Sequence, residues 1–363
     1  MAEKTVWIDS TTAMSSSDSV RAFISSRSPS TPQRIAFASV VACAAAAFAL
    51  SQFSRGRPHS DFGMVWYGAR ALLRNIDPYL VIGPGKPFDY EWPLIYPGTA
   101  LVAVMPFTML TEEWATTVFV GVSTWLLAFG LTRDGWYRIP IFTTSAFIAS
   151  AQLGQWSILF TAALFLPQIL FFSIAKPQAS IAILAATRDR RGILAAVAGA
   201  LFLLTVSLLL SPHWISSWID VVGRATQMEP PIVRFGGLAL LVVLLRWRRP
   251  ETWLLLVLAV SPQSWGWYGT LPIFTIPKSF AESVFLAATA LAGAWYADNV
   301  LNPTSLDGLV SSVGTVIVMT IYLPATLLIL RRKNEGPSPV WLSWPSHTIA
   351  KDGSRLPPDN KLR

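Results

Sequence analysis

Asp61 is the residue whose type and position point most directly to chemistry. It follows the first apolar run of the chain, Ile35 to Phe53, which is long enough to cross a bilayer core of roughly 30 Å. The next segment carries apolar residues at helical spacing, at positions 62, 65, 66, 69, 72 and 73. Such a helix would lie in the plane of the membrane interface and hold Asp61 at the water boundary. A carboxylate fixed there can accept a proton from a hydroxyl substrate while a lipid-borne partner arrives from the side.

A second interpretation of Asp61 is structural. Acidic residues are common where helices begin, because a side-chain oxygen can cap backbone N–H groups and the negative charge is favoured there. Asp61 would then only start the helix, and the sequence leaves both interpretations open.

The composition is that of a polytopic membrane protein. Of 363 residues, 53% are hydrophobic and 13% are charged, whereas soluble domains are about a quarter charged. The net charge of +8 therefore bears on orientation in a membrane, and no basic run interleaved with aromatic residues points to nucleic acid. The single cysteine, Cys43, excludes an intrachain disulfide, and no Cys/His cluster suggests zinc.

The apolar segments predict an all-α bundle of about ten to twelve transmembrane spans over residues 35–330. Several segments are too short to span alone, and prolines within them predict broken or re-entrant helices. The segments lie near 35–53, 94–110, 114–131, 139–152, 156–167, 169–187, 192–211, 232–246, 251–262, 264–277, 280–296 and 309–330. The polar stretches 1–34 and 331–363 are expected to be disordered tails.

Clusters of Arg and Lys set the expected orientation, because cytoplasmic loops carry an excess of both. The clusters at 188–191, 246–249 and 331–333 should be cytoplasmic together with both tails, in a cell membrane, with the loop 54–93 outside. That loop nevertheless carries five cations, Arg55, Arg57, Arg70, Arg74 and Lys86. Either the topology is inverted there, or the cations have a function, such as binding a phosphate-bearing ligand.

Other polar residues have two interpretations each. Lys176 lies in an apolar stretch, where a charge is either functional or a lysine that reaches the interface. Glu282 follows Lys278 at the spacing of a helical ion pair. His213 opens an outer segment that either covers a site or simply connects two spans. Gln152, Gln155 and Ser157 form a polar patch between two spans, typical of contacts between helices. Asp77-Pro78-Tyr79 is typical of a turn. Asp89 and Glu91 could bind a divalent metal, although a solvated loop is the simpler interpretation.

Two familiar motifs are absent. The chain has no phosphate-binding glycine loop followed by Lys and Ser or Thr, and no G-x-S-x-G elbow. Its halves do not repeat, which weakens the case for a transporter built on inverted repeats.

Several short motifs together resemble glycosyltransferase family 87, whose members are multispan enzymes of the GT-C class. The resemblance begins with Asp61-Phe62, Trp66, Gly68-Ala69, Ala71-Leu72-Leu73 and Asp77-Pro78-Tyr79. It continues in order with Tyr96-Pro97, Gly154-Gln155, Lys176-Pro177-Gln178 and Ser261-Pro262-Gln263-Ser264-Trp265, over roughly residues 55–300. The chain departs from the family pattern at Asn75, Gly98 and Ser157.

The resemblance implies a mannosyltransferase-like enzyme that uses a polyprenyl-phosphate sugar from the outer leaflet and a lipid or glycan acceptor. Its catalytic Asp maps to Asp61, which would act as general base with inversion at the sugar. The donor phosphate would be held first by Arg70, with Lys176, His213 and Arg224 as further candidates. Trp66, Tyr67, Gln178 and Trp265 are the expected sugar or acceptor contacts. The scheme requires no cofactor or metal. The alternatives are a transporter or flippase of a lipid-linked sugar or small solute, and an inactive protein of the same fold.

Overall fold

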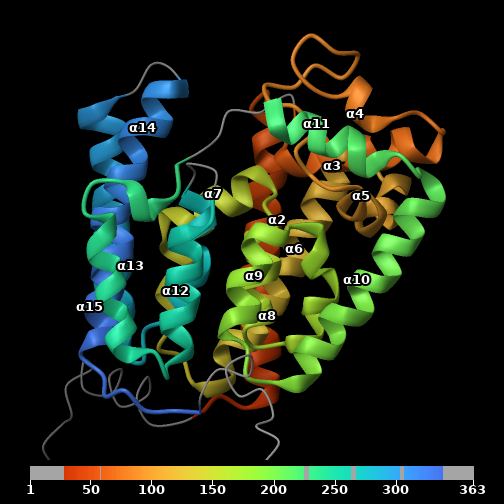
Figure 1. Cartoon of the computed structure of the whole chain (residues 1–363). Coiled ribbons are helices and arrows are strands. Elements are labelled where there is room, and N and C mark those ends of the chain that lie inside the picture. Colours follow the sequence, from red (N-terminus) through yellow and green to blue (C-terminus); the bar gives the residue numbers. More distant parts are fainter. Residues whose placement is uncertain (1–27, 58, 225–228, 263–266, 303–305, 338–363) are drawn as a thin grey trace, which may run out of the picture.

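The computed structural model describes residues 28–57, 59–224, 229–262, 267–302 and 306–337, and all regular elements in these ranges are helical (Figure 1). The α-helices are α2 (Thr31–Ser54), α3 (Asp61–Leu73), α4 (Pro78–Val81), α5 (Gly98–Val104), α6 (Glu112–Leu131), α7 (Ser145–Leu153), α8 (Ser157–Ala163), α9 (Pro177–Ala186), α10 (Arg190–Leu210), α11 (Trp214–Arg224), α12 (Pro250–Val260), α13 (Phe280–Tyr296), α14 (Leu306–Ile317) and α15 (Leu323–Leu330). Tighter or wider helical turns connect them: η1 (Met105–Met109), η2 (Thr132–Asp134), η3 (Ile139–Thr143), η4 (Pro167–Ala175), η5 (Pro231–Val233), η6 (Gly237–Arg246), η7 (Trp267–Thr275), η8 (Ala297–Leu301) and η9 (Val318–Tyr322).

Five of the described helices are long and apolar enough to cross a membrane: Thr31–Ser54, Glu112–Asp134, Arg190–Leu210, Phe280–Leu301 and Ser312–Leu330. The other predicted apolar segments also contain helix, but as shorter pieces. A helical protein with several membrane spans is therefore supported. The count of ten to twelve spans stays a prediction, because the short pieces do not reach spanning length individually.

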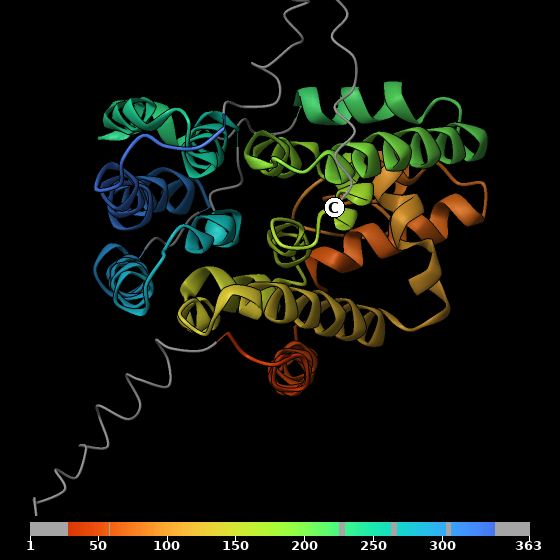
Figure 2. The same cartoon turned by 90° about the horizontal axis from the view of Figure 1, so that it is seen from below.

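The helices form two groups around the middle of the molecule (Figure 2). Those from η6 onward gather on one side and most of α3 to α11 lie on the other, whereas η3 and α7 lie between them in contact with α13. The first long helix, α2, packs along α6 at the edge of the second group. Its buried positions are mostly alanines, Ala38, Ala42, Ala45 and Ala49, which allow close approach of the two helices.

The two ends of the bundle differ in composition. The segment with α3 and α4 lies at one end together with α11, and α15 finishes at the opposite end (Figure 1). At that opposite end, Arg246 Nη2 donates to the Leu330 carbonyl at 2.9 Å and Arg249 Nε donates to the Lys333 carbonyl at 2.6 Å. Two of the predicted basic clusters therefore meet at one end, away from the loop 54–93.

The predicted tails need correction at both boundaries. Helix α2 begins at Thr31, so the last residues of the predicted 1–34 tail are helical; Ser30 and Gln33 form a capping box there. Beyond α15, the carbonyls of Arg332 and Lys333 accept hydrogen bonds from the side chains of Arg246 and Arg249, and Asn334 Oδ1 accepts from the Arg248 backbone N–H at 3.0 Å. Residues 1–27 and 338–363 lie outside the described residues.

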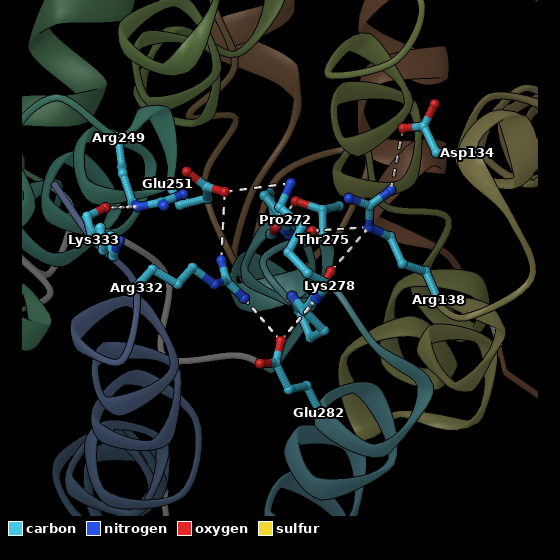
Figure 3. A network of polar contacts seen from close by, with 11 residues as sticks. Asp134, Arg138, Arg249, Glu251, Pro272, Thr275, Lys278, Glu282, Arg332 and Lys333 are labelled. Carbon is cyan, nitrogen blue, oxygen red and sulfur yellow. Dashed lines mark hydrogen bonds and ion pairs between the residues drawn. The ribbon is translucent and has the colours of Figure 1, made fainter. Parts of the chain in front are cut away.

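A network of ion pairs joins α12, α13 and the end of α15 (Figure 3). Arg332 lies between two carboxylates, 3.4 Å from Glu251 and 2.8 Å from Glu282, and Lys278 lies 3.3 Å from Glu251. The predicted pair between Lys278 and Glu282 side chains is therefore wrong. Glu282 accepts from the Lys278 backbone N–H at 2.8 Å instead. Tertiary packing brings Arg332 between the two acids, which local helical spacing cannot reveal.

We predict that Arg332→Ala lowers thermal stability strongly, because it leaves two poorly solvated carboxylates without their shared partner. The side chains of Arg332 and Glu251 are each 11% exposed. Breaking such a pair costs about 3–5 kcal/mol. Melting of the detergent-purified protein measures the effect, with the exposed neighbour Arg331→Ala as the matched control. Equal melting temperatures for the two variants would contradict a stabilising network.

Candidate functional site

Ser60, and not Asp61, caps helix α3. The Ser60 hydroxyl accepts a hydrogen bond from the Gly63 N–H at 2.9 Å, and the Ser60 N–H donates to Glu112 Oε1 at 3.0 Å. Asp61 is the first residue of the helix and its carboxylate makes other contacts. Asp61 therefore does not cap the helix, but it does lie in the first turn, where a negative charge is favoured, as the structural interpretation also allowed.

Helix α3 packs its apolar stripe against protein. Phe62, Val65, Trp66, Ala69 and Leu72 are all buried, and only the last stripe residue, at position 73, is exposed. The helix contacts α5, η1 and α6. This corrects the expectation that the stripe faces the membrane interface. An amphipathic pattern predicts that one face is covered but does not say by what.

The Asp61 carboxylate is held by two donors. The Tyr90 hydroxyl donates to Oδ1 at 2.6 Å, and the Gln155 side-chain amide donates to Oδ2. Gln155 is 1% exposed, and its carbonyl oxygen accepts from Lys176 Nζ at 2.9 Å. One amide therefore links a carboxylate to an ammonium group. Asp61 and Lys176 are both partly exposed, so the charged ends of this link stay accessible.

A tight turn brings Gln155 to this position. Gly154 ends α7 in the left-handed region, with φ of 68°. A side chain there would lie 2.9 Å from Thr116 and 3.0 Å from Phe62. Both the backbone conformation and the crowding therefore require glycine. Lys176 directly precedes α9, where Pro177 suits the first helical turn.

Two tyrosine rings flank the Lys176 ammonium group. Its Nζ lies 5.3 Å from the ring centre of Tyr96 and 5.3 Å from that of Tyr268, and it donates to the Tyr96 hydroxyl at 3.4 Å. Aromatic faces stabilise a cation that has lost part of its water. Lys176 thus has neutral partners and no directly paired carboxylate in these contacts, which leaves its charge available to an anionic ligand.

The protein raises the pKa of Asp61, chiefly because the surroundings remove water from the carboxylate. The hydrogen bond from Tyr90 and the charges of Lys176 and Arg57 lower that pKa, but by less. A raised pKa makes the carboxylate a better proton acceptor. Burial and the Asp61 charge also raise the pKa of Tyr90, so its hydroxyl keeps its proton and stays a donor.

Aromatic side chains form a partly exposed wall beside Asp61. The rings of Tyr67 and Phe88 stack with centres 3.8 Å apart, and the rings of Phe88 and Tyr90 stack at 6.1 Å. Stacked, partly exposed rings suit the apolar face of a sugar or an isoprenoid chain. Trp66, the other predicted contact on this helix, is 2% exposed and donates its indole N–H to the Phe107 carbonyl at 3.0 Å. It belongs to the core.

The predicted phosphate ligands lie in different places. Lys176 and Arg57 are the positive charges with the largest effect on Asp61. Arg70 instead covers the ring of Trp66, with 4.6 Å between its guanidinium carbon and the ring centre. His213 and Arg224 are exposed, before and at the end of α11. Of the predicted sugar contacts, Gln178 is partly buried in α9, and Trp265 lies outside the described residues.

The segment after His213 is a helix that covers the loop 77–96. Its Ser217 hydroxyl donates to Asp77 Oδ2 at 3.0 Å, and the Trp218 indole N–H donates to the Ile95 carbonyl at 2.8 Å. Trp214 packs on Gly98, where a side chain would collide with the indole ring. Of the two interpretations of this segment, covering part of the site region fits better than a bare connection. Asp77 caps α4 by accepting from the Tyr79 N–H at 2.9 Å.

Sequence reasoning missed Tyr90 as a site residue. It named Arg57 only among the five loop cations, Tyr96 only within a motif, and Gln155 within a motif and as a packing residue. Tyr90 had one available signal, its place between two acids in an aromatic-rich stretch. Nothing local could connect it with Asp61, because the contact spans 29 residues of chain. Among the described residues, no group of three or more His, Cys, Asp or Glu side chains could hold a metal ion.

No family model, curated protein or solved structure matches this chain.

We predict that Asp61→Asn raises thermal stability near neutral pH. A folded-state pKa above the unfolded value means that the charged carboxylate destabilises the native protein, and this penalty grows as pH rises. The melting temperature of the variant should exceed that of the wild type near pH 7, and the difference should shrink toward about pH 4, where the wild-type carboxyl is protonated. A variant that melts below the wild type at every pH would contradict the assignment.

Proposed function

We propose that this protein is an integral-membrane glycosyltransferase of the GT-C class that moves a hexose, most simply mannose, from a polyprenyl-phosphate donor to a lipid or glycan acceptor. One observation carries the proposal: the buried Gln155 amide joins Asp61 and Lys176. A proton acceptor and a cation for phosphate are thereby fixed side by side, next to an aromatic wall. The order of the motifs that resemble glycosyltransferase family 87 supports the same activity.

Each group has a role in the proposed reaction. Asp61 takes the proton of the acceptor hydroxyl while that oxygen attacks the anomeric carbon from the face opposite the phosphate, so the configuration inverts. The bond between the anomeric carbon and the phosphate oxygen breaks, and its electron pair leaves with the phosphate. This leaving group is a stable anion and needs no general acid, unlike the alcohol released in glycoside hydrolysis. Lys176 and Arg57 stabilise the growing charge.

The bonds to Asp61 suit a base that must stay charged and oriented. Tyr90 and Gln155 occupy one position on each carboxylate oxygen. A carboxylate oxygen accepts more than one hydrogen bond, so lone pairs remain for the acceptor hydroxyl. The two donors also fix the rotation of the side chain, which keeps the reacting oxygen in one place.

The membrane setting supports a lipid-borne donor. Loop 54–93 is cation-rich, although the basic clusters predict it to be outside the cytoplasm. Nucleotide sugars are cytoplasmic, whereas a polyprenyl phosphate can present its sugar at the outer surface of a cell membrane. The partners are thus a lipid-linked sugar, an acceptor and membrane lipids, and the proposed step needs no cofactor.

A transporter or flippase is the main rival, and an inactive protein of this fold is another. Transport favours charged groups along a path between the helices. In the described part of the chain, the ion pairs lie either beside Asp61 or in the network at the opposite end. This distribution supports a site at one end.

We predict that Asp61→Asn abolishes transfer of labelled sugar from polyprenyl-phosphate donors to membrane lipid extract while the protein still folds. Loss of a general base costs roughly 10²- to 10⁴-fold in rate. The matched control is Asp89→Asn, which changes an exposed acid of the same loop that accepts from the Gly85 N–H at 2.9 Å. Near wild-type turnover by the Asp61 variant would remove it from the mechanism. Robust transfer from a nucleotide sugar would overturn the donor assignment.

We predict that both tails are cytoplasmic and that loop 54–93 is outside. Reporter fusions after Lys86 and after Lys333 test this, because an enzyme active only outside the cytoplasm should work only in the first fusion. The prediction rests on the basic segments 246–249 and 331–333, which contact each other at one end of the bundle, because basic segments are enriched on the cytoplasmic side. A cytoplasmic reporter at Lys86 would contradict both the topology and the use of an outer-leaflet donor.

A further inference from the structure

His59 and Glu112 form a hydrogen-bonded pair that the proposed reaction does not yet use. The Nδ1 atom of His59 lies 3.0 Å from Glu112 Oε2. The His59 side chain is 29% exposed and that of Glu112 is 10% exposed. His59 also precedes Asp61 by two residues, on the segment that leads into α3.

The carboxylate of Glu112 is fixed in orientation. Its other oxygen, Oε1, accepts from the Ser60 N–H at 3.0 Å. Gly63 leaves the space that the carboxylate occupies, because a side chain at this position would collide with it. The Glu112 carboxylate is therefore fixed beside the first turn of α3. Its Oε1 accepts from the Ser60 N–H, and its Oε2 contacts His59.

The imidazole ring of His59 is part of the aromatic wall. Its centre lies 4.6 Å from that of Phe88, 5.9 Å from that of Tyr67 and 6.5 Å from that of Tyr90. Tyr90 is the residue that donates to Asp61. The ring thus lies close to the residue that binds the base, and it is held by Glu112 at Nδ1 and by edge-on and tilted contacts with the neighbouring rings.

This orientation leaves one nitrogen of His59 for a ligand. Nδ1 faces Glu112, and Nε2 has no hydrogen-bond partner among the described residues. When Nε2 carries a hydrogen, it can donate that hydrogen to an anion. With Lys176 and Arg57, His59 would complete a set of three donors around the departing group.

We propose that His59, oriented by Glu112, binds the phosphate of the lipid-linked donor and of the polyprenyl phosphate that transfer releases. This inference rests on the proposed function, because it assigns a ligand to the same site. His59 would touch the substrate through Nε2, whereas Glu112 would act as a positioning residue.

Binding of farnesyl phosphate to the purified full-length protein tests the proposal, with farnesol and inorganic phosphate as separate arms. His59→Gln should weaken farnesyl phosphate binding by roughly 10- to 100-fold, the effect of one hydrogen bond to a charged group. Farnesol binding should not change. Arg55→Gln, which removes an exposed charge from the same loop, is the control for general attraction. Equal farnesyl phosphate affinity in the wild type and His59→Gln would overturn the proposal.

Two variants of Glu112 separate positioning from simple folding. In Glu112→Gln the carbonyl must accept from the Ser60 N–H, so the NH₂ group would donate to His59 Nδ1 and hold the ring with its hydrogen on Nε2. Glu112→Gln should therefore keep most of the affinity for farnesyl phosphate, whereas Glu112→Ala should weaken it. In the His59→Gln background, Glu112→Ala should have no further effect. A loss from Glu112→Ala that is equally large with and without His59 would contradict the positioning role of Glu112.

The remaining arms separate this proposal from the transferase assignment. If the wild type binds farnesyl phosphate through His59 but transfers no sugar, the phosphate-site proposal stands and the transferase proposal is overturned. If the wild type transfers sugar but His59→Gln binds farnesyl phosphate as tightly as the wild type does, the transferase proposal stands and the phosphate-site proposal is overturned. Equal His59 dependence for inorganic phosphate would identify a free-phosphate site and overturn the lipid assignment.

Discussion

The amide of Gln155 is the interaction on which the rest of the candidate site depends. Its NH₂ group donates to Asp61 and its carbonyl accepts from Lys176, so each charge fixes one end of the amide. An isolated charge in an apolar protein is costly, whereas a polar group between two charges lowers that cost for both. The left-handed turn at Gly154 directly precedes Gln155, and Lys176 directly precedes the helix that starts at Pro177. These two local structures position Gln155 and Lys176 for the link.

The two ends of the bundle use similar side chains with opposite results. In the network at the opposite end, Glu251 and Glu282 contact Arg332 directly, and such pairs neutralise one another and hold three helices. At the candidate site, Asp61 contacts a hydroxyl and an amide, both neutral, and Lys176 contacts an amide and two tyrosine rings. A charged side chain whose partners are neutral is not neutralised, so it can still attract a ligand of opposite charge. This difference distinguishes the structural cluster from the candidate site.

Local sequence patterns predicted the helices well and their surroundings poorly. The segment 61–73 is helical over its predicted length, and apolar runs predicted the long spans, because both signals depend on neighbours a few residues apart. Contacts across the fold were not predictable in this way. Tyr90 reaches Asp61 over 29 residues and Arg332 reaches Glu251 over 81. The apolar stripe of α3 was real, but whether protein or lipid covers such a stripe depends on the tertiary arrangement.

One residue of offset explains why Asp61 is available for chemistry. Had Asp61 been the cap, its carboxylate would have been bound to the backbone of α3. Ser60 takes that task, and its own N–H is satisfied by Glu112 from the neighbouring helix α6. Glu112 in turn orients His59 on the other side of the same turn. The hydrogen bonds that cap α3 therefore come from residues other than Asp61, and the Asp61 carboxylate keeps a raised pKa and a partly exposed position.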